Sequence, residues 1–184
     1  MELRFLSSNR FKIAEATTIL SAVGVNVIPV SAKIEELQTE NTKQLVKDKL
    51  LKAYSQIGHP IFVEHTGLYL DYINGLPGGL TQIFWDKLQA DKFSQIFGQF
   101  PNNSVQAKTV VGYCNGRNIY YFEGEISGCI SPNPRGNKEF QWDCVFIPEG
   151  YDKTFAELGD EKNKISMRRK ALDRLAEFLE KERE

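Results

Sequence analysis

The sequence of 184 residues contains little cysteine, little histidine and no excess charge of either sign. Its three cysteines are odd in number and form no C-x-x-C pair, which favours reduced thiols over disulfides or a zinc site. Lys and Arg total 23 against 24 Asp and Glu, so no basic field is available to hold a nucleic acid. No apolar run reaches about 18 residues, which argues against a membrane span and a signal peptide. We therefore expect a cytoplasmic protein with no nucleic-acid or membrane partner.

Several motifs that carry nucleotide or hydrolytic chemistry are also absent. The chain has no G-x-x-x-x-G-K-[ST] loop, no G-x-G-x-x-G fingerprint, no H-E-x-x-H helix and no G-x-S-x-G elbow. These absences exclude, at motif level, the P-loop, dinucleotide-binding, zincin and α/β-hydrolase folds. What remains is a set of short polar clusters at the ends of predicted elements, where α/β proteins bind their ligands.

The spacing of apolar residues predicts an α/β protein built as one domain over residues 1–184. Asn115-Gly116 predicts a hairpin turn between two long strands, and Thr42 is positioned to cap a helix. The predicted strands are residues 2–7, 25–30, 61–63, 104–114 and 119–130, and residues 151–158 are expected to be irregular or β. The predicted helices are residues 10–23, a helix that starts at Thr42, and residues 81–97. A further helix is predicted at the C-terminus, with an apolar face formed by Leu172, Leu175, Ala176 and Leu179.

The first two polar clusters lie near the N-terminus. Residues 7–12 fall where the first strand ends and the first helix begins, and free N–H groups at a helix start favour an anion such as phosphate. The alternative is that Ser8 or Asn9 only caps the helix. The second cluster is the acidic pair Glu35-Glu36 in a predicted loop, which is either a solvated surface feature or part of a site, depending on what lies opposite.

The other two clusters combine acids, an imidazole, aromatic rings and cations. Residues 64–67 (Glu-His-Thr-Gly) follow the predicted strand 61–63 and include one of the two histidines, with a glycine that allows close approach of a ligand. Residues 140–143 (Phe-Gln-Trp-Asp) and the basic stretch 161–169 suit stacking on a base and binding of phosphate. The alternative for the aromatic side chains is core packing.

The order of these clusters resembles the inosine triphosphate pyrophosphatase family, the non-canonical purine NTP pyrophosphatases. The resemblance extends over almost the whole chain. It rests on Ser7-x-Asn9-x-x-Lys12-x-x-Glu15, Val63-Glu64-His65-Thr66-Gly67-Leu68, Gly75-Leu76-Pro77-Gly78, Phe140-x-Trp142-Asp143, Thr154-x-Ala156-Glu157 and Glu161-Lys162-Asn163-x-x-Ser166-x-Arg168.

The resemblance implies an elongated α/β fold with a long central mixed sheet flanked by helices, two lobes around a cleft, and a homodimer. It implies hydrolysis of a nucleoside triphosphate to the monophosphate and pyrophosphate with Mg²⁺. By position, Lys12, Glu64 and His65 would be catalytic. Glu36, Glu64 and His65 would hold the metal, with Glu35 as the alternative to Glu36.

The same resemblance implies the substrate-binding positions. Lys49 would join the residues that hold the phosphate tail, with Lys52 as the competing choice. Phe140 and Trp142 would flank the base, and Asp143 would form a hydrogen bond with it. The full substrate-binding set is Ser7, Asn9, Lys12, Lys49, Thr66, Gly67, Phe140, Trp142, Asp143, Lys162, Met167 and Arg168.

Three positions depart from the family pattern. His65 stands where the family has Asp, and imidazole is a poor Mg²⁺ ligand but a good base near neutral pH. His65 could therefore take a proton from water while Glu36 and Glu64 hold the metal, or it could favour Mn²⁺. Gln141 replaces a Gly and Met167 replaces a His, so we expect the base preference to differ from that of the relatives.

We therefore expect a metal-dependent pyrophosphohydrolase that acts on a non-canonical purine (d)NTP with an altered base preference. The alternative is a catalytically impaired nucleotide-binding or regulatory protein on the same fold. A purely structural dimer would account for the fold but not for the retained cations Lys12, Lys49, Lys162 and Arg168.

Overall fold

The computed structural model, which describes residues 1–182, contains a mixed sheet of seven strands in that part of the chain. The strand order is β2-β1-β3-β5-β6-β7, and the short β4 pairs with β3. β1 runs parallel to β2 and β3, whereas the other neighbours are antiparallel. The strands are β1 (Glu2–Leu6), β2 (Asn26–Val30), β3 (Ile61–Leu70), β4 (Pro77–Gly78), β5 (Ser104–Cys114), β6 (Ile119–Ile130) and β7 (Phe146–Pro148).

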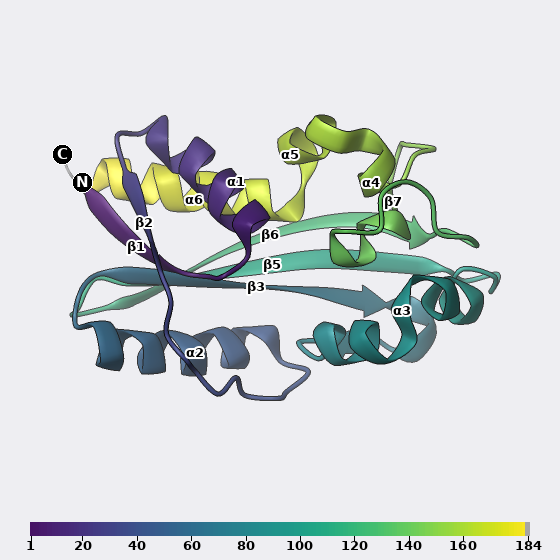
Figure 1. Cartoon of the computed structure of the whole chain (residues 1–184), viewed down its shortest axis with the longest axis horizontal. Coiled ribbons are helices and arrows are strands. Elements are labelled where there is room, and N and C mark those ends of the chain that lie inside the picture. Colours follow the sequence, from purple (N-terminus) through teal and green to yellow (C-terminus); the bar gives the residue numbers. More distant parts are fainter. Residues whose placement is uncertain (183–184) are drawn as a thin grey trace.

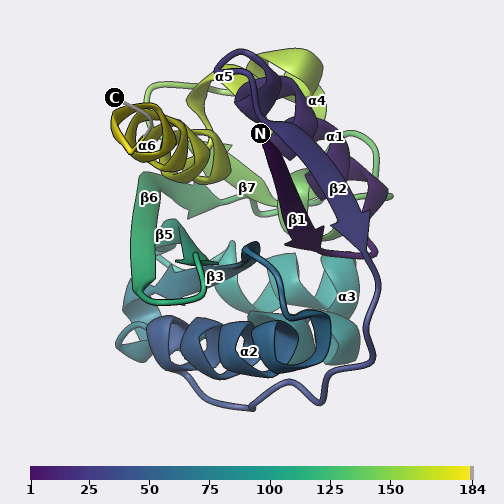
Figure 2. The same cartoon turned by 90° about the vertical axis from the view of Figure 1, so that its left-hand side faces the viewer.

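Helices cover both faces of this sheet and confirm the predicted α/β class. Figures 1 and 2 show α1, α4, α5 and α6 on one face and α2 and α3 on the other. The helices are α1 (Arg10–Ser21), α2 (Thr42–Ile57), α3 (Thr81–Phe97), α4 (Phe155–Leu158), α5 (Lys162–Ile165) and α6 (Met167–Lys181), with 3₁₀ turns η1 (Asp71–Ile73), η2 (Gln141–Cys144) and η3 (Gly159–Glu161).

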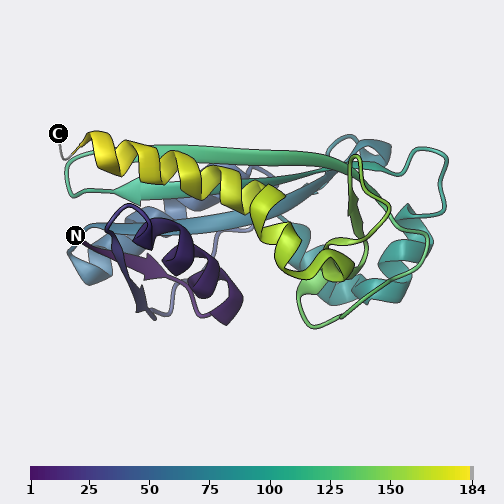
Figure 3. The same cartoon turned by 90° about the horizontal axis from the view of Figure 1, so that it is seen from above.

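The C-terminal helix α6 packs along the sheet as its periodicity predicted. All four residues of its predicted apolar face are buried in one core cluster with residues of β1, α1 and β5. Figure 3 shows α6 lying along β6. At Gly124 of β6, a Cβ would overlap the carbonyl oxygen of Met167, so the lack of a side chain lets the helix backbone approach the strand.

The start of α2 corrects one sequence prediction. The N-cap is Asn41, whose side-chain oxygen accepts a hydrogen bond from the N–H of Gln44 at 3.0 Å. Thr42 is instead the first helical residue, and its buried hydroxyl lies 2.6 Å from the Tyr69 hydroxyl. A long-range partner on β3 thus engages the side chain that the local pattern assigned to the cap.

Two other segments differ from the prediction. β3 does not end at Val63 but continues to Leu70, because it pairs with β5 along its whole length from Ile61 to Leu70. Residues 155–158 are helical rather than irregular or β, since Thr154 and Glu157 form a capping box at the start of α4. The predicted Glu-His-Thr-Gly cluster therefore lies within a strand and not after it.

Candidate functional site

The site lies where the edge of β3 is not covered by another strand. β1 pairs with β3 only at residues 61 and 62, and β4 pairs with it only at residues 68 and 69. The backbone N–H of Leu68 points to this edge, where it donates to the Thr81 hydroxyl at 2.8 Å. Because strand amides alternate, the N–H groups of Glu64 and Thr66 face the gap between β1 and β4. Consecutive side chains in the gap point to opposite faces of the sheet.

On the α1 and α6 face, Glu64 is the centre of a buried network of charges. Its carboxylate forms an ion pair with Lys12 and accepts a hydrogen bond from Arg168 Nε at 2.8 Å. Arg168 Nη1 also donates to Glu15 at 2.6 Å. Burial alone would raise the pKa of Glu64, but the Arg168 and Lys12 charges outweigh it and hold this pKa well below its usual range. The Glu64 carboxylate is therefore ionised and already engaged by two cations.

Burial acts to lower the pKa of both cations of this network, but the neighbouring carboxylates outweigh it for Arg168 only. Burial lowers the pKa of Lys12 even though Glu64 lies beside it. For Arg168, burial acts in the same direction, but Glu64 and Glu15 outweigh it and keep its pKa above the usual value. Arg168 is thus a permanent buried cation that ties α6 to β3 and α1.

On the opposite face, His65 lies beside Glu36 and Lys49. Lys49 Nζ donates to Glu36 Oε1 at 2.8 Å, and His65 Nδ1 is 4.0 Å from the same oxygen. Burial would raise the pKa of Glu36, but Lys49 holds it below its ordinary value. The competing residues Glu35 and Lys52 do not enter this group, because Lys52 Nζ bonds to the Glu35 backbone oxygen and to Asp48.

The tautomer of His65 follows from its hydrogen bond to the backbone. His65 Nε2 lies 3.1 Å from the carbonyl oxygen of Gly79, which can only accept, so Nε2 carries the proton. Nδ1 is then the unprotonated nitrogen, and it faces Glu36. Burial, followed by the repulsion of Lys12, lowers the pKa of His65 to about 4. His65 is therefore a neutral imidazole with a free lone pair at neutral pH, and its lowered pKa makes it a weaker base than the sequence led us to expect.

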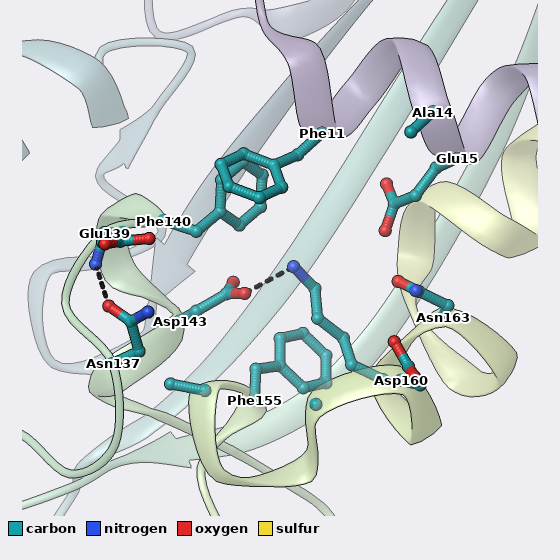
Figure 4. Close-up of a pocket in the computed structure, with 13 residues that line it drawn as sticks. Phe11, Ala14, Glu15, Asn137, Glu139, Phe140, Asp143, Phe155, Asp160 and Asn163 are labelled. Atoms are coloured by element: carbon teal, nitrogen blue, oxygen red, sulfur yellow. Dashed lines mark hydrogen bonds and ion pairs between the residues drawn. The ribbon is translucent and has the colours of Figure 1, made fainter.

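At the other end of the site, Lys162 and Asp143 form a buried pair next to aromatic rings. Lys162 Nζ lies 2.5 Å from Asp143 Oδ2 and 4.2 Å from the centre of the Phe140 ring. Burial lowers the pKa of Lys162 and raises that of Asp143. Figure 4 shows Phe140, Asp143 and Phe155 around an outer cavity of about 300 Å³, which Phe11 and Glu15 of α1 also line.

Two adjoining cavities bring most of the predicted residues together. The central cavity, about 120 Å³, is lined by Lys12, Glu36, Lys49, His65, Thr66, Thr81, Gln82, Trp85, Phe140, Gln141, Trp142, Asp143, Met167 and Arg168. The N-terminal cavity, about 210 Å³, is lined by Leu6, Ser7, Ser8, Asn9, Lys12, Lys49, Glu64 and Gln141. The Asn9 side chain caps α1 by accepting from the N–H groups of Phe11 and Lys12, which was the alternative interpretation of residues 7–12.

Several predicted site residues have additional structural roles. Trp142 is buried and its ring contacts those of Phe146 and Phe155, so core packing accounts for most of its surface. Met167 is equally buried. Gly67 does not line either cavity; a Cβ there would overlap the carbonyl oxygen of Gly78, so it lets β4 approach β3.

The predicted metal ligands are only partly assembled. The structure brings Glu36 and His65 together, whereas the Glu64 carboxylate lies on the other face of β3 between Lys12 and Arg168. Within residues 1–182, no three side chains of His, Cys, Asp and Glu form a group that could hold a metal ion. Glu64 is thus engaged by two cations in this structure, and its role as a metal ligand stays a prediction.

The sequence reasoning missed the residues that α3 contributes. Thr81, Gln82 and Trp85 border the central cavity, but they gave no signal because their spacing is that of an ordinary helix. Glu15 is part of the N-terminal motif that carries the resemblance, but the sequence assigned no function to it. Glu15 follows Lys12 by three residues, so both side chains lie on one face of α1. This spacing was the sequence feature that could have indicated that Glu15 belongs to the site.

The fold and these cavities define an α/β protein whose site combines several buried cations with aromatic rings at one end, an arrangement suited to a polyanion that carries a ring. A model of the Ham1 family matches residues 3–178. This chain therefore belongs to the Ham1 family.

Similar proteins agree with this assignment. The dITP/XTP pyrophosphatase of Methanopyrus kandleri is 37% identical over 180 residues, which cover 97% of this chain and 96% of the relative. The inosine triphosphate pyrophosphatase of Yarrowia lipolytica is 36% identical, with 97% and 96% covered. The solved structure of a HAM1 protein from Coxiella burnetii matches with a TM-score of 0.84 and 26% identity, over 97% of this chain and 98% of that one.

Among the helices of residues 1–182, none is both long and apolar enough to cross a membrane.

Proposed function

We propose that this protein is a nucleoside triphosphate pyrophosphohydrolase that cleaves a non-canonical purine (d)NTP to the (d)NMP and pyrophosphate. The names of the related proteins support the substrate class. The observation that carries the proposal is the pair of adjoining cavities, which share Lys12 and Lys49, with the neutral imidazole of His65 in the wall of the central one. The phosphates would lie against Lys12 and Lys49, and the base near Phe140 and Asp143.

The charges of the site indicate what the substrate must bring. A triphosphate carries about four negative charges, and phosphoryl transfer depends mainly on positioning and on neutralising that charge. Each cation of the site already has a carboxylate partner. The pairs are Lys12 with Glu64, Lys49 with Glu36, Lys162 with Asp143, and Arg168 with Glu64 and Glu15.

A divalent cation bound to the triphosphate would supply the missing positive charge. Hard cations such as Mg²⁺ usually bind through one or two carboxylates together with substrate phosphates. Glu36 fits this role, because it lines the central cavity and a third of its side chain is exposed. Glu36 would hold the ion there, and the ion would supply positive charge that offsets the charge of the phosphates. In the alternative to a role as base, His65 Nδ1 would itself be a ligand beside Glu36, and this would favour Mn²⁺.

His65 is the proposed general base. Hydrolysis forms a bond between the oxygen of water and phosphorus and breaks the α–β anhydride, so pyrophosphate leaves and one proton of the water must be accepted. The Nδ1 lone pair of His65 is free to accept it, since Nε2 is held by the Gly79 carbonyl. Lys12 and Lys49 would hold the phosphates in line, and Arg168 would fix Glu64 and hence the position of Lys12.

The base preference is proposed to differ from that of relatives with a His at position 167. The Met167 side chain has no N–H group, and it lines the central cavity with Phe140 and Asp143. A purine with a 6-oxo group would therefore lose one donor, which weakens discrimination against other bases.

The test is pyrophosphate release from a panel of canonical, deaminated and modified NTPs with Mg²⁺ or Mn²⁺. The variant His65→Gln keeps an amide donor for the Gly79 carbonyl but lacks a base, so kcat should fall by about 10² to 10⁴ while folding is retained. A kcat within a factor of about three of the unaltered protein would rule out His65 as the base. Binding by calorimetry without any turnover would favour the alternative, a non-catalytic nucleotide-binding protein.

A further inference from the structure

Gln141 adopts a backbone conformation that is unusual for its side chain. Its φ is +45°, in the left-handed region that glycine enters freely and other residues enter at a cost in free energy. Asn74 and Gln89 also have positive φ, but neither lines the central or the N-terminal cavity. The strained residue that borders these two cavities is thus Gln141, and such strain at a site points to a function of the side chain.

The Gln141 side chain reaches across to α3. Its Nε2 donates to Gln82 Oε1 at 2.5 Å, and Gln82 Nε2 in turn donates to Asp86 Oδ1 at 2.7 Å. Asp86 therefore fixes which end of the Gln82 amide faces Gln141. Gln82 and Asp86 are exposed, so water can replace the Gln141 amide at this partner when a ligand draws it away.

Gln141 also lies at the junction of the two cavities. Three residues line both of them: Lys12, Lys49 and Gln141. The two lysines are cations suited to phosphate, whereas Gln141 offers a neutral amide that can both donate and accept a hydrogen bond. In a nucleotide, the sugar is the part that joins the base to the phosphates. Gln141 shares both cavities with Lys12 and Lys49, which the proposed function places at the phosphates, and it directly follows Phe140, which the proposed function places at the base. A neutral amide between these two groups is therefore placed next to the sugar.

We propose that the Gln141 amide binds a hydroxyl group of the substrate's ribose and makes this protein discriminate between nucleotides by their sugar. This inference rests on the proposed function, and it assigns a role to a residue that the catalytic scheme above does not use. When the nucleotide enters, Gln141 exchanges its bond to Gln82 for a bond to the sugar. The 2′ and 3′ hydroxyls have the same chemistry, and the experiment separates them.

The experiment compares kcat/KM for ITP, 2′-deoxy-ITP and 3′-deoxy-ITP. A hydrogen bond between an amide and a hydroxyl corresponds to about threefold to tenfold in kcat/KM, so the unaltered protein should disfavour one of the two deoxy analogues by that factor. In Gln141→Gly the preference should disappear, with the three substrates within about twofold of one another. Because glycine tolerates φ +45°, this variant should fold and melt at no lower temperature than the unaltered protein.

The control variant is Gln82→Ala, which removes the bridge to α3 but leaves the Gln141 amide in place. It should keep the preference for the hydroxylated sugar. An unchanged preference in Gln141→Gly would overturn the inference. So would an equal loss in both variants, because the bridge itself and not a contact with the sugar would then be responsible.

Failure of the proposed function would look different. If the unaltered protein hydrolyses none of the three nucleotides, their Kd values by calorimetry replace kcat/KM in the same comparison. Equal Kd values for the three sugars would reject the role of Gln141, whereas failure to bind any of them would reject the nucleotide site as a whole.

Discussion

Replacing Glu64 by Gln tests whether the buried charge network stabilises the fold as well as forming the site. Glu64 and Arg168 have side chains only 2% and 3% exposed, and Lys12 is 21% exposed. The amide keeps the size of the side chain and removes its charge. Arg168 would then retain only Glu15 as a charged partner, and Lys12 would lose its carboxylate.

The expected loss is large because a buried ion pair would be broken on one side only. Removing one partner of such a pair costs about 3 to 5 kcal/mol, since the other charge is left without compensation. We expect the lower end, about 3 kcal/mol, because the new amide can still accept a hydrogen bond from Arg168 and because Lys12 is partly solvated. For a chain of this length that loss corresponds to a melting temperature lower by about 6 to 12 °C.

The assay is urea unfolding followed by circular dichroism at neutral pH, with Glu36→Gln as the matched control. The Lys49–Glu36 pair is a third exposed on the Glu36 side, so its loss should cost at most about 1 kcal/mol. Simultaneous replacement of Glu64 and Glu15 by Gln and of Arg168 by Met should recover part of the lost stability, because neither the cation nor its two carboxylates then remain. A loss below about 1 kcal/mol in Glu64→Gln, or equal losses in both single variants, would refute the reasoning.

Two further outcomes are expected from the same contacts. The pKa of Glu64 lies well below its ordinary value of 4.5 in the folded protein, so the stability that this carboxylate contributes is complete above that pH and is lost as the pH falls below it. Urea titrations between about pH 5 and pH 3 should therefore show a shallower fall in the free energy of unfolding for Glu64→Gln than for the unaltered protein, and parallel curves would contradict this. Gly124→Ala would place a Cβ against the carbonyl oxygen of Met167 and should lower the free energy of unfolding by about 1 to 3 kcal/mol; urea unfolding at an unchanged midpoint would show that α6 has room to move.

The parts of the fold that follow from local chemistry were predictable from the sequence. The apolar face of α6 repeats at helical spacing, and Asn115-Gly116 has the turn chemistry of a hairpin, so both were found. The extension of β3 was not predictable in this way. Four polar or flexible residues after Val63 have the pattern of a strand end, and only pairing with β5 keeps them extended.

In the candidate site, too, some features were predictable from the sequence and others were not. The resemblance supplied the positions of its cations and acids, but not which carboxylate each cation contacts. Arg168 reaches Glu64 and Glu15 across 104 and 153 residues of sequence, and no local pattern reports such a pairing. Trp142 shows a second limit of prediction from sequence. An aromatic residue in a motif looks the same in the sequence whether its ring contacts a ligand or packs in the core, and the Trp142 ring contacts that of Phe146.

The pairing of charges also gives a physical meaning to the near-zero net charge of the chain. Several buried cations in one site repel one another when no anion is bound. Burial also lowers the pKa of Lys12 and of Lys162. The carboxylates beside them, Glu64 and Asp143, act in the opposite direction and raise these pKa values. Since Glu36 is the most exposed acid of these pairs, its partner Lys49 is the cation most readily released to the substrate. If the proposed function is correct, a divalent cation at Glu36 would free Lys49 for a phosphate oxygen, and binding of the metal and of the triphosphate would then be coupled.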